Sequence, residues 1–247
     1  MTTPALQIDK IAKRFGGVTA TRDVSLSIMP GERRLLIGPN GAGKTTLFNQ
    51  IAGDFLPDSG SIHLFGQDMT RLPTRKRVAM GLGRTYQVLT LFPHDTLIHN
   101  VALALLGTEG GRWTPWGALA GRRALHVRAE QALDRVGLCD AAQRRVSETS
   151  YGERRRLELA MALAQNPRLL LLDEPLAGLS ADERTTIRRL LEAIPRDITI
   201  VLIEHDMDVA LAFADRITLL NFGEVIVEGT RAEVIADPRT REVYLGS

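Results

Sequence analysis

A chain of 247 residues can form one large domain or two small ones and can bury a substantial core. Hydrophobic residues make up 44% and charged residues 24%, which excludes a disordered or collagen-like chain. The 31 Lys and Arg against 29 Asp and Glu leave a formal net charge of +2. This charge is too small to favour nucleic acid or an anionic membrane surface as the main partner.

The cysteine content and the apolar runs restrict the class further. Cys139 is the only cysteine, which excludes an intrachain disulfide and a zinc site built from several thiolates, and favours a reducing compartment. Residues 1–6 lack the basic and apolar regions of a secretion signal, so we expect no export. No run of 18 apolar residues occurs, so we expect any membrane role to be peripheral.

The first elements expected along the chain are short strands. The alternation of Val24, Leu26 and Ile28 predicts one strand, and residues 62–65 predict another after the turn-forming run 57–60. We expect these strands to form an antiparallel portion. Between them, residues 34–37 lead into a glycine loop and a helix, which is the order of a phosphate-binding unit.

The second half of the chain predicts helices followed by a parallel sheet. Residues 88–165 follow a helical pattern, and residues 169–172 and 198–203 predict buried strands joined by a helix. The apolar stripes expected on these helices are Leu125, Ala129, Ala132 and Val136; Leu157, Ala160, Met161 and Ala164; and Ile187, Leu190, Leu191 and Ile194. A hairpin at 221–223 and a short helix opened by a capping box from Thr230 to Glu233 follow.

These elements predict an α/β fold with a mostly parallel core sheet, an N-terminal antiparallel β portion and an inserted helical subdomain. We expect a single domain over residues 1–247, with the insertion at about 88–165.

Residues 38–45 fit the phosphate-loop pattern G-x-x-x-x-G-K-[ST] in its strand-to-helix setting. Glycines let backbone N–H groups converge on phosphate oxygens, and the helix presents its positive end to the same anion. A glycine-rich turn that binds nothing is the weaker interpretation, because context and residues agree. The nucleotide-binding residues predicted here are Gly38, Pro39, Asn40, Gly41, Ala42, Gly43, Lys44, Thr45 and Thr46.

Two side chains of the phosphate loop and two carboxylates divide the expected chemistry. Lys44 is expected to contact the β and γ phosphates, and the Thr45 hydroxyl to bind magnesium. Asp173 and Glu174 end the buried strand 169–172, and strand alternation points them in different directions. We expect Asp173 to bind magnesium and Glu174 to orient or deprotonate the attacking water. These motifs establish only a P-loop ATPase or GTPase.

A helix is expected to begin at Ser150, Tyr151, Gly152 and Glu153. The serine hydroxyl, the glycine and the free N–H groups of this helix start predict a second phosphate-binding cradle. Plain N-capping by Ser150, with Glu153 completing a capping box, is the alternative and is compatible with it. Residues 149–153, Thr-Ser-Tyr-Gly-Glu, resemble the LSGGQ signature of ABC ATPases. The resemblance covers essentially the whole chain, from residue 6 to residue 246.

This resemblance implies a shared site: the cradle of residues 150–153 closes over ATP held by the phosphate loop of an opposite subunit, and two nucleotides lie between two cassettes. Gln87 matches the glutamine that senses magnesium and water, and His205 matches the switch histidine that contacts the γ-phosphate. Phe15 falls where the family stacks an aromatic ring on adenine, with a core side chain as the alternative. The implied catalytic residues are Glu174, His205 and Gln87, and the implied metal-binding residues are Thr45, Gln87 and Asp173.

For several other features we prefer a structural role to a functional one. Ser180 stands where many members carry a D-loop aspartate, and we expect it to cap a helix with Glu183. The basic clusters 75–77 and 154–156 are expected on solvated helix faces rather than on nucleic acid. Trp113 and Trp116 are expected in a partly buried loop, with a permease or membrane contact as the alternative.

Within the family, the chain most resembles the longer ATPase of branched-chain amino acid importers. The resemblance rests on segments 84–87, 91–93, 203–207 and 243–246, and on segment 107–123, which lengthens the helical subdomain as in that ATPase. The resemblance implies ATP and Mg²⁺ as cofactors and a peripheral place at the cytoplasmic face of the inner membrane. Its implied partners are a second ABC ATPase subunit, identical or different, membrane permease subunits and, indirectly, an extracytoplasmic substrate-binding protein.

Two rival classes remain. A soluble ABC ATPase of the cluster-assembly type is also one short cassette, whereas the DNA-repair and translation members carry long coiled coils or second cassettes that this sequence lacks. A P-loop kinase or GTPase is expected to lack the cradle at 150–153.

Overall fold

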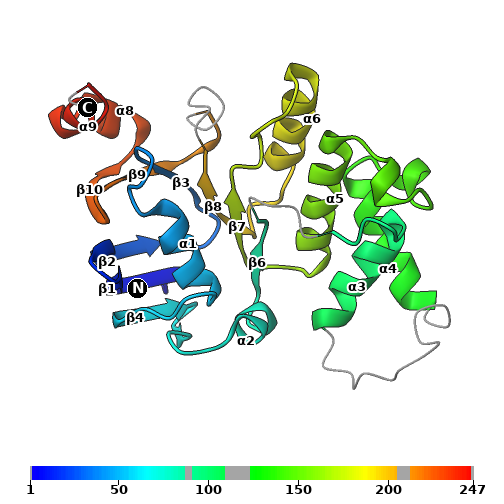
Figure 1. The fold of residues 1–247 in the computed structure, drawn as a ribbon, viewed down its shortest axis with the longest axis horizontal. Coiled ribbons are helices and arrows are strands. Elements are labelled where there is room, and N and C mark those ends of the chain that lie inside the picture. Colours follow the sequence, from blue (N-terminus) through cyan, green and yellow to red (C-terminus); the bar gives the residue numbers. More distant parts are fainter. Residues whose placement is uncertain (1, 87–90, 109–122, 205–211, 246–247) are drawn as a thin grey trace. The chain divides into compact units, whose positions relative to one another are not determined.

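The computed structural model describes residues 2–86, 91–108, 123–204 and 212–245, and these form two compact units. The first unit comprises Met1–Leu82, Arg168–Glu174 and Ile194–Ser247, and the second comprises Gly83–Pro167 and Pro175–Ala193. The chain therefore enters the second unit twice. Figure 1 labels the elements of both units.

The first unit contains a four-stranded antiparallel sheet in the order β2-β1-β4-β5. Its strands are β1 (Leu6–Phe15), β2 (Val18–Ile28), β4 (Ser59–Leu64) and β5 (Gln67–Asp68). The buried alternation expected in β2 is confirmed. The pattern did not predict β1, because positive φ at Lys10 and a register shift between Ile8 and Ile11 break its alternation.

The mostly parallel sheet has the order β10-β9-β3-β8-β7-β6, and its strands belong to the first unit except for Gly83 and Arg84 of β6. β3 pairs in parallel with β8 and β9, β7 pairs in parallel with β8, and β9 and β10 form the antiparallel hairpin expected at 221–223. The sheet topology confirms the predicted fold class. The strand bounds are β3 (Arg33–Ile37), β6 (Leu82–Arg84), β7 (Leu169–Asp173), β8 (Thr199–Ile203), β9 (Arg216–Asn221) and β10 (Glu224–Gly229).

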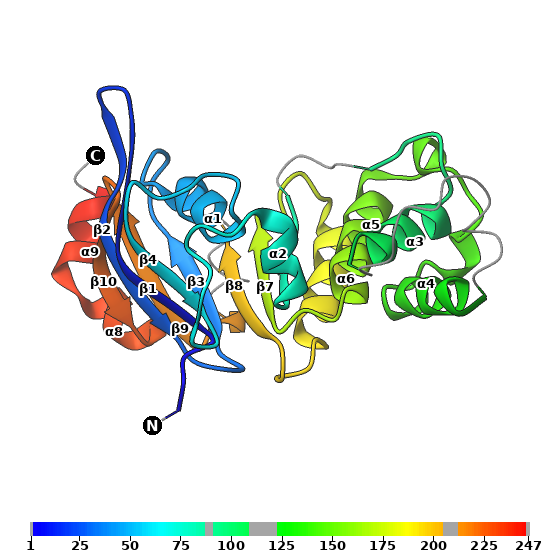
Figure 2. The ribbon, with the colours of Figure 1, turned by 90° about the horizontal axis from the view of Figure 1, so that it is seen from below.

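One core joins the two sheets through helix α1 (Lys44–Ala52). Leu47, Phe48 and Ile51 of α1 are fully buried and pack with apolar side chains of both sheets. Figure 2 shows α1 beside these strands. The helix thus has a rigid base, and its N-terminal end follows directly from β3 through the phosphate loop.

The described part of the first unit also contains the short helices α2 (Thr74–Ala79), α8 (Arg231–Ala236) and α9 (Pro238–Leu245). The capping box from Thr230 to Glu233 opens α8, as expected. The solvated face expected for the cluster 75–77 is wrong for Arg77, whose side chain is fully buried. Burial is tolerated because its guanidinium donates to four backbone carbonyls.

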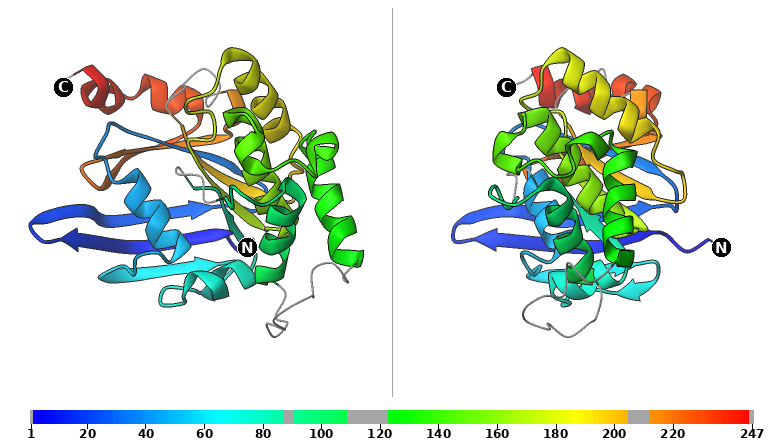
Figure 3. Two further views of the ribbon diagram at one scale, coloured as in Figure 1. Left: turned by 45° about the vertical axis from the view of Figure 1, so that its right-hand side comes forward. Right: turned by 90° about the vertical axis from the view of Figure 1, so that its right-hand side faces the viewer.

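The second unit is helical in its described part, with α3 (Leu97–Thr108), α4 (Arg123–Arg135), α5 (Tyr151–Ala164), α6 (Ala181–Glu192) and two short 3₁₀ turns, Cys139–Ala141 and Val146–Glu148. Helices α3, α4 and α5 pack pairwise against one another (Figure 3). This unit includes the described part of 88–165, and it also includes α6, which joins β7 to β8 in sequence.

The predicted stripes are correct for most positions. Val136 and Ile194 are buried but lie just beyond the ends of α4 and α6. Met161 and Leu190 are only partly buried. Helix boundaries explain the first difference, because a residue after the last turn can still face the core. Trp113 and Trp116 lie outside the described residues.

The cluster 154–156 is also not a simple solvated face. Arg155 is 4% exposed and donates to the backbone oxygen of Tyr86 at 3.0 Å and to the Glu158 carboxylate at 3.1 Å. The Glu158 carboxylate in turn accepts from the Tyr86 N–H at 2.9 Å. A buried ion pair on α5 therefore holds both the backbone N–H and the backbone carbonyl of Tyr86.

Candidate nucleotide-binding and catalytic site

The phosphate loop lies between the fully buried strand β3 and the start of α1. Gly38 and Gly43 have φ angles of 148° and 100°. A Cβ atom on Gly38 would lie 2.1 Å from the Leu220 carbonyl oxygen, and one on Gly43 would lie 2.4 Å from that of Ala20. Both positions therefore require glycine for two reasons, backbone conformation and close backbone approach.

Lys44 is held within this loop. Its ammonium donates to the carbonyl oxygens of Gly38 at 2.7 Å and Pro39 at 3.0 Å, and its side chain is buried. Burial lowers the pKa of Lys44, while the nearby carboxylates of Glu174 and Asp173 oppose that shift. The Lys44 ammonium and the two carboxylates thus interact electrostatically. The ammonium favours an anionic ligand, and the carboxylates favour a metal cation bound with it.

The two carboxylates follow each other at the end of β7. Asp173 is 1% exposed and pairs in register with Ile203 of β8. Glu174 is partly buried, and its backbone N–H donates to the Ile203 carbonyl at 2.9 Å. Its φ of 48° lies in the left-handed region, which costs a non-glycine residue about 1 kcal/mol or more. Glu174 therefore lies in the turn that follows β7 and not in the extended strand itself.

The oxygen ligands at this end of the sheet fit magnesium. Thr45 is exposed on the first turn of α1, and Asp173 supplies carboxylate oxygens. Magnesium keeps several waters and takes few protein oxygens when it is bound with a nucleotide phosphate. Within the described ranges, no group of three or more His, Cys, Asp or Glu side chains could hold a metal alone. The donor set therefore suits a metal that arrives with its nucleotide.

Phe15 is not a core side chain. It is 44% exposed at the end of β1, and its ring meets the Phe55 ring edge to face, with centroids 5.3 Å apart. The Lys13 ammonium lies 5.6 Å from the Phe15 centroid. The exposed ring leaves a surface on which a planar base can stack.

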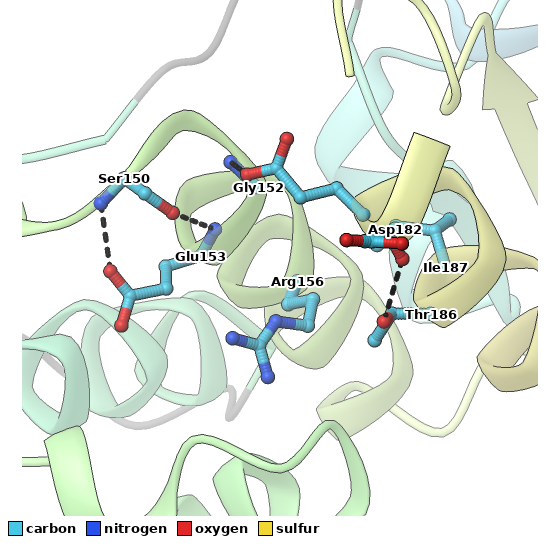
Figure 4. A pocket seen from close by; sticks show the side chains of 8 residues that line it. Ser150, Gly152, Glu153, Arg156, Asp182, Thr186 and Ile187 are labelled. Atoms are coloured by element: carbon cyan, nitrogen blue, oxygen red, sulfur yellow. Dashed lines mark hydrogen bonds between the residues drawn. The ribbon is translucent and has the colours of Figure 1, made fainter. Parts of the chain in front are cut away.

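The expected cradle at the start of α5 forms a complete capping box. The Ser150 hydroxyl accepts from the Glu153 N–H at 3.1 Å, and the Glu153 carboxylate accepts from the Ser150 N–H at 2.7 Å. Figure 4 shows these two contacts. Tyr151 is exposed, and the other Glu153 oxygen accepts from Arg144 at 2.9 Å.

The expectation that the N–H groups of this cradle are free is wrong for two of them. The Glu153 N–H is bound by Ser150, and the Gly152 N–H donates to the Glu183 carboxylate at 3.1 Å. Glu183 also completes the capping box of Ser180 at the start of α6, so the N-capping role expected for Ser180 is confirmed. One carboxylate therefore binds the N-terminal ends of α5 and α6, both in the second unit.

Two predicted catalytic residues, Gln87 and His205, lie outside the described residues. The structure describes the residues before them. Tyr86 is held by the Arg155–Glu158 pair, and Glu204 is buried directly after β8. The elements that lead into both segments are therefore fixed.

Sequence reasoning missed two residues near the phosphate-binding elements. Burial raises the pKa of the Tyr244 phenol, and a hydrogen bond with the Gly38 backbone opposes that shift. Tyr244 on α9 thus contacts the first glycine of the phosphate loop, which no local pattern indicates. The contact from Glu183 to Gly152 was missed for the same reason, because the two residues are 31 positions apart.

Comparisons with known proteins agree with this geometry. Residues 21–177 match the ABC transporter family. LivG of Escherichia coli strain K12, a high-affinity branched-chain amino acid transport ATP-binding protein, is 39% identical over 254 residues, with 100% of this chain and 99% of LivG covered.

Two solved structures share the fold. A nucleotide-free ATP-binding cassette from an ABC transporter gives a TM-score of 0.88 at 28% identity, covering 99% of this chain and 100% of that chain. The cassette MJ0796, solved as a dimer in a post-hydrolysis state with ADP and phosphate, gives a TM-score of 0.78 at 27% identity, covering 91% and 98% of the two chains.

Proposed function

This chain belongs to the ABC transporter family and is an ATPase, and we propose that it drives a membrane permease importing branched-chain amino acids or related small polar or organic-acid solutes. The observation that carries the proposal is the 39% identity to LivG over the full length of both chains. The rival of a soluble, cluster-assembly ATPase is not favoured, because this full-length relative is a transport protein.

The proposed nucleotide seat is the phosphate loop with the exposed ring of Phe15. Backbone N–H groups of residues 40–46 and the positive end of α1 bind the phosphates, whereas Pro39 has no N–H to donate. Lys44 exchanges its carbonyl contacts for phosphate oxygens, which is favourable because a charged acceptor makes the stronger hydrogen bond. Phe15 stacks on the base.

The proposed chemistry is attack of water on the γ-phosphorus of ATP, with cleavage of its bond to the β,γ-bridging oxygen and release of ADP and phosphate. Magnesium, held by Thr45 and Asp173, would neutralise charge on the phosphates. Glu174 orients the water and accepts its proton, with its backbone fixed by the bond to Ile203. Gln87 and His205 are proposed to sense the metal, water and γ-phosphate, as the family resemblance implies.

The proposed working unit is a dimer, as the family resemblance implies for the cradle of residues 150–153. The Ser150 end of α5 in one subunit closes on ATP bound at Lys44 of the other. Residues 150–153 then contact the γ-phosphate, and ATP shifts the equilibrium by binding the closed state better. The dimeric MJ0796 structure with ADP and phosphate supports a dimer as the working unit.

The proposed partners are a second ABC ATPase, identical or different, and permease subunits that receive solute from an extracytoplasmic binding protein. No helix in the described residues is long and apolar enough to cross a membrane. Because the relative LivG is a transport ATP-binding protein, we propose that this subunit is peripheral at the cytoplasmic face of the inner membrane and that its partners recognise the solute.

Replacement of the Glu174 carboxylate tests the enzymatic part of the proposal. Glu174→Gln is expected to keep ATP binding, to lower turnover about 100-fold or more, and to trap an ATP-bound dimer. Sedimentation with and without ATP measures the dimer, and phosphate release measures turnover. The control Glu192→Gln removes a half-exposed carboxylate on α6 and is expected to behave as wild type.

Two outcomes contradict the proposal. Unchanged phosphate release by Glu174→Gln in the assembled transporter contradicts the role of Glu174, and a Lys44→Ala variant with wild-type ATP affinity contradicts the phosphate loop. The transport assignment is tested separately by copurification from solubilised membranes and by ATP-dependent leucine uptake into vesicles that contain the permease. Absence of any membrane partner supports the soluble class instead.

A further inference from the structure

Glu153, Glu183 and Glu233 each complete a capping box at the start of an α-helix in the described residues, so their other contacts can be compared. Glu183 accepts from the Ser180 N–H at 3.0 Å and from its hydroxyl at 2.8 Å. Glu233 makes the same pair of contacts with Thr230, at 2.7 and 2.9 Å. Only Glu183, among these described boxes, binds the backbone of another helix, through the Gly152 N–H.

The contact to Gly152 is close and specific. A Cβ atom at Gly152 would lie 2.2 Å from the carboxylate oxygen of Glu183, so glycine is what allows the approach. The two residues line a cavity of about 210 Å³ together with Ser150 and Arg156 (Figure 4). The cavity therefore lies at the start of α5, the end of the helix proposed to receive phosphate.

The carboxylate is well held there. Its bonds from the Ser180 backbone and hydroxyl, and to a smaller extent from Gly152 and the charge of Arg156, lower the pKa of Glu183. The group is therefore an anion near neutral pH. The Glu183 carboxylate already accepts a hydrogen bond from an N–H group of α5 and lies at the positive end of this helix. These are the two features that attract phosphate.

We propose that Glu183 is an internal anion that occupies the phosphate cradle of α5 and is displaced from Gly152 when the γ-phosphate of ATP on the partner subunit arrives. This inference rests on the proposed dimer. One backbone N–H cannot serve two anions at full strength, and two anions at one helix end repel each other. Displacing Glu183 therefore raises the ATP concentration that closes the dimer.

The displaced carboxylate does not lose all of its partners. Its second oxygen keeps the Ser180 contacts, and the Arg156 guanidinium lines the same cavity. The displacement is thus a local side-chain movement that leaves the cap of α6 in place. Glu183 acts as a positioning residue: it sets the ATP requirement for closure without touching the reacting atoms.

The experiment compares variants in the Glu174→Gln background, where the ATP-bound dimer accumulates. The ATP concentration that gives half-maximal dimer is measured by sedimentation or light scattering. Glu183→Gln keeps the shape but weakens the bond to Gly152, since neutral acceptors bind an N–H about half as strongly. The half-maximal ATP concentration is expected to fall about fivefold.

The matched control is Glu233→Gln, which makes the same chemical change in the capping box of α8. Its half-maximal ATP concentration is expected to stay within about twofold of the parent. Glu183→Asp serves as a second variant: it keeps the charge but is too short by one methylene to reach both Ser180 and Gly152. Glu183→Asp is also expected to lower the half-maximal ATP concentration. If Glu183→Gln is poorly folded, Glu183→Asp alone tests the inference.

An unchanged or higher ATP requirement in folded Glu183→Gln or Glu183→Asp overturns the inference, because a purely structural link between α5 and α6 predicts weaker closure on its loss. In that case the parent still dimerises, and the proposed function stands. A parent that stays monomeric at saturating ATP contradicts the proposed dimer and this inference together.

Discussion

At the scale of single residues, two glycines of the phosphate loop differ in how strictly their positions require glycine. Gly41 and Gly43 both have positive φ, at 81° and 100°. Open space surrounds the position of a Cβ on Gly41, whereas the Ala20 carbonyl lies 2.4 Å from that of Gly43. The two glycines therefore bear different constraints, although the sequence pattern alone treats both as loop residues.

Gly43→Ala is expected to lower the free energy of unfolding by roughly 3 kcal/mol, because backbone strain and a backbone clash add. Gly41→Ala, which meets only the strain, is expected to cost about 1 kcal/mol. Urea denaturation without nucleotide measures both. Equal losses in the two variants would show that the contact with Ala20 relaxes at little cost.

At the scale of elements, two buried arginines donate hydrogen bonds to backbone carbonyls of other elements. Arg77 of α2 donates to the carbonyls of Gln50 and Ile51, at 2.6 and 2.8 Å, in the last turn of α1. Those carbonyls have no partner within the helix ladder. Arg155 of α5 binds Tyr86, directly before the segment that contains Gln87. Each arginine thus fixes the backbone of an element that carries predicted site residues.

Arg77→Met is expected to lower the free energy of unfolding by about 3 kcal/mol, because it leaves several buried carbonyls without a donor. Burial lowers the pKa of Arg77, because desolvation disfavours the charged guanidinium, while Asp54 and Asp68 oppose the shift. Lys76→Met, at the exposed neighbour, is expected to stay within about 0.5 kcal/mol of wild type. A similar loss in both would contradict the capping role.

At the scale of the whole molecule, described carboxylates in several elements share one direction of pKa shift. Hydrogen bonds lower the pKa of Glu183 and Glu233 from 4.5, chiefly from Ser180 and Thr230. The same holds, from 3.8, for Asp58, Asp68 and Asp237, whose main partners are Lys13, Thr70 and Arg239. Each contributes stability that is present above its unfolded pKa and is lost as the pH falls through the lower folded value.

Resistance to urea is therefore expected to fall steadily below about pH 4.5, where the unfolded chain binds more protons than the folded one. Unfolding midpoints measured in small pH steps give the slope. The double variant Glu183→Gln and Glu233→Gln is expected to show a shallower acid slope than wild type, since two of the shifted groups are gone. An identical slope would mean that these caps do not couple to folding.

The sequence by itself determined the local chemistry: the phosphate loop from 38 to 45, the adjacent carboxylates Asp173 and Glu174, and the capping boxes at Ser150, Ser180 and Thr230. Each is a short motif whose parts lie within a few residues, so helix and strand geometry places them without the rest of the fold. The α/β class followed as well, because apolar periodicity reports which face each element buries.

Only the tertiary structure decided which basic residues are buried, that α6 groups with the helical unit, and that Glu183 binds Gly152. It also disclosed β1, whose bulge hides its alternation. The physical reason is the same for the buried basic residues, the grouping of α6 and the Glu183 contact: each depends on partners distant in the chain. A guanidinium or carboxylate looks solvated in sequence until the fold brings carbonyls or N–H groups to it, and those contacts offset the cost of removing it from water.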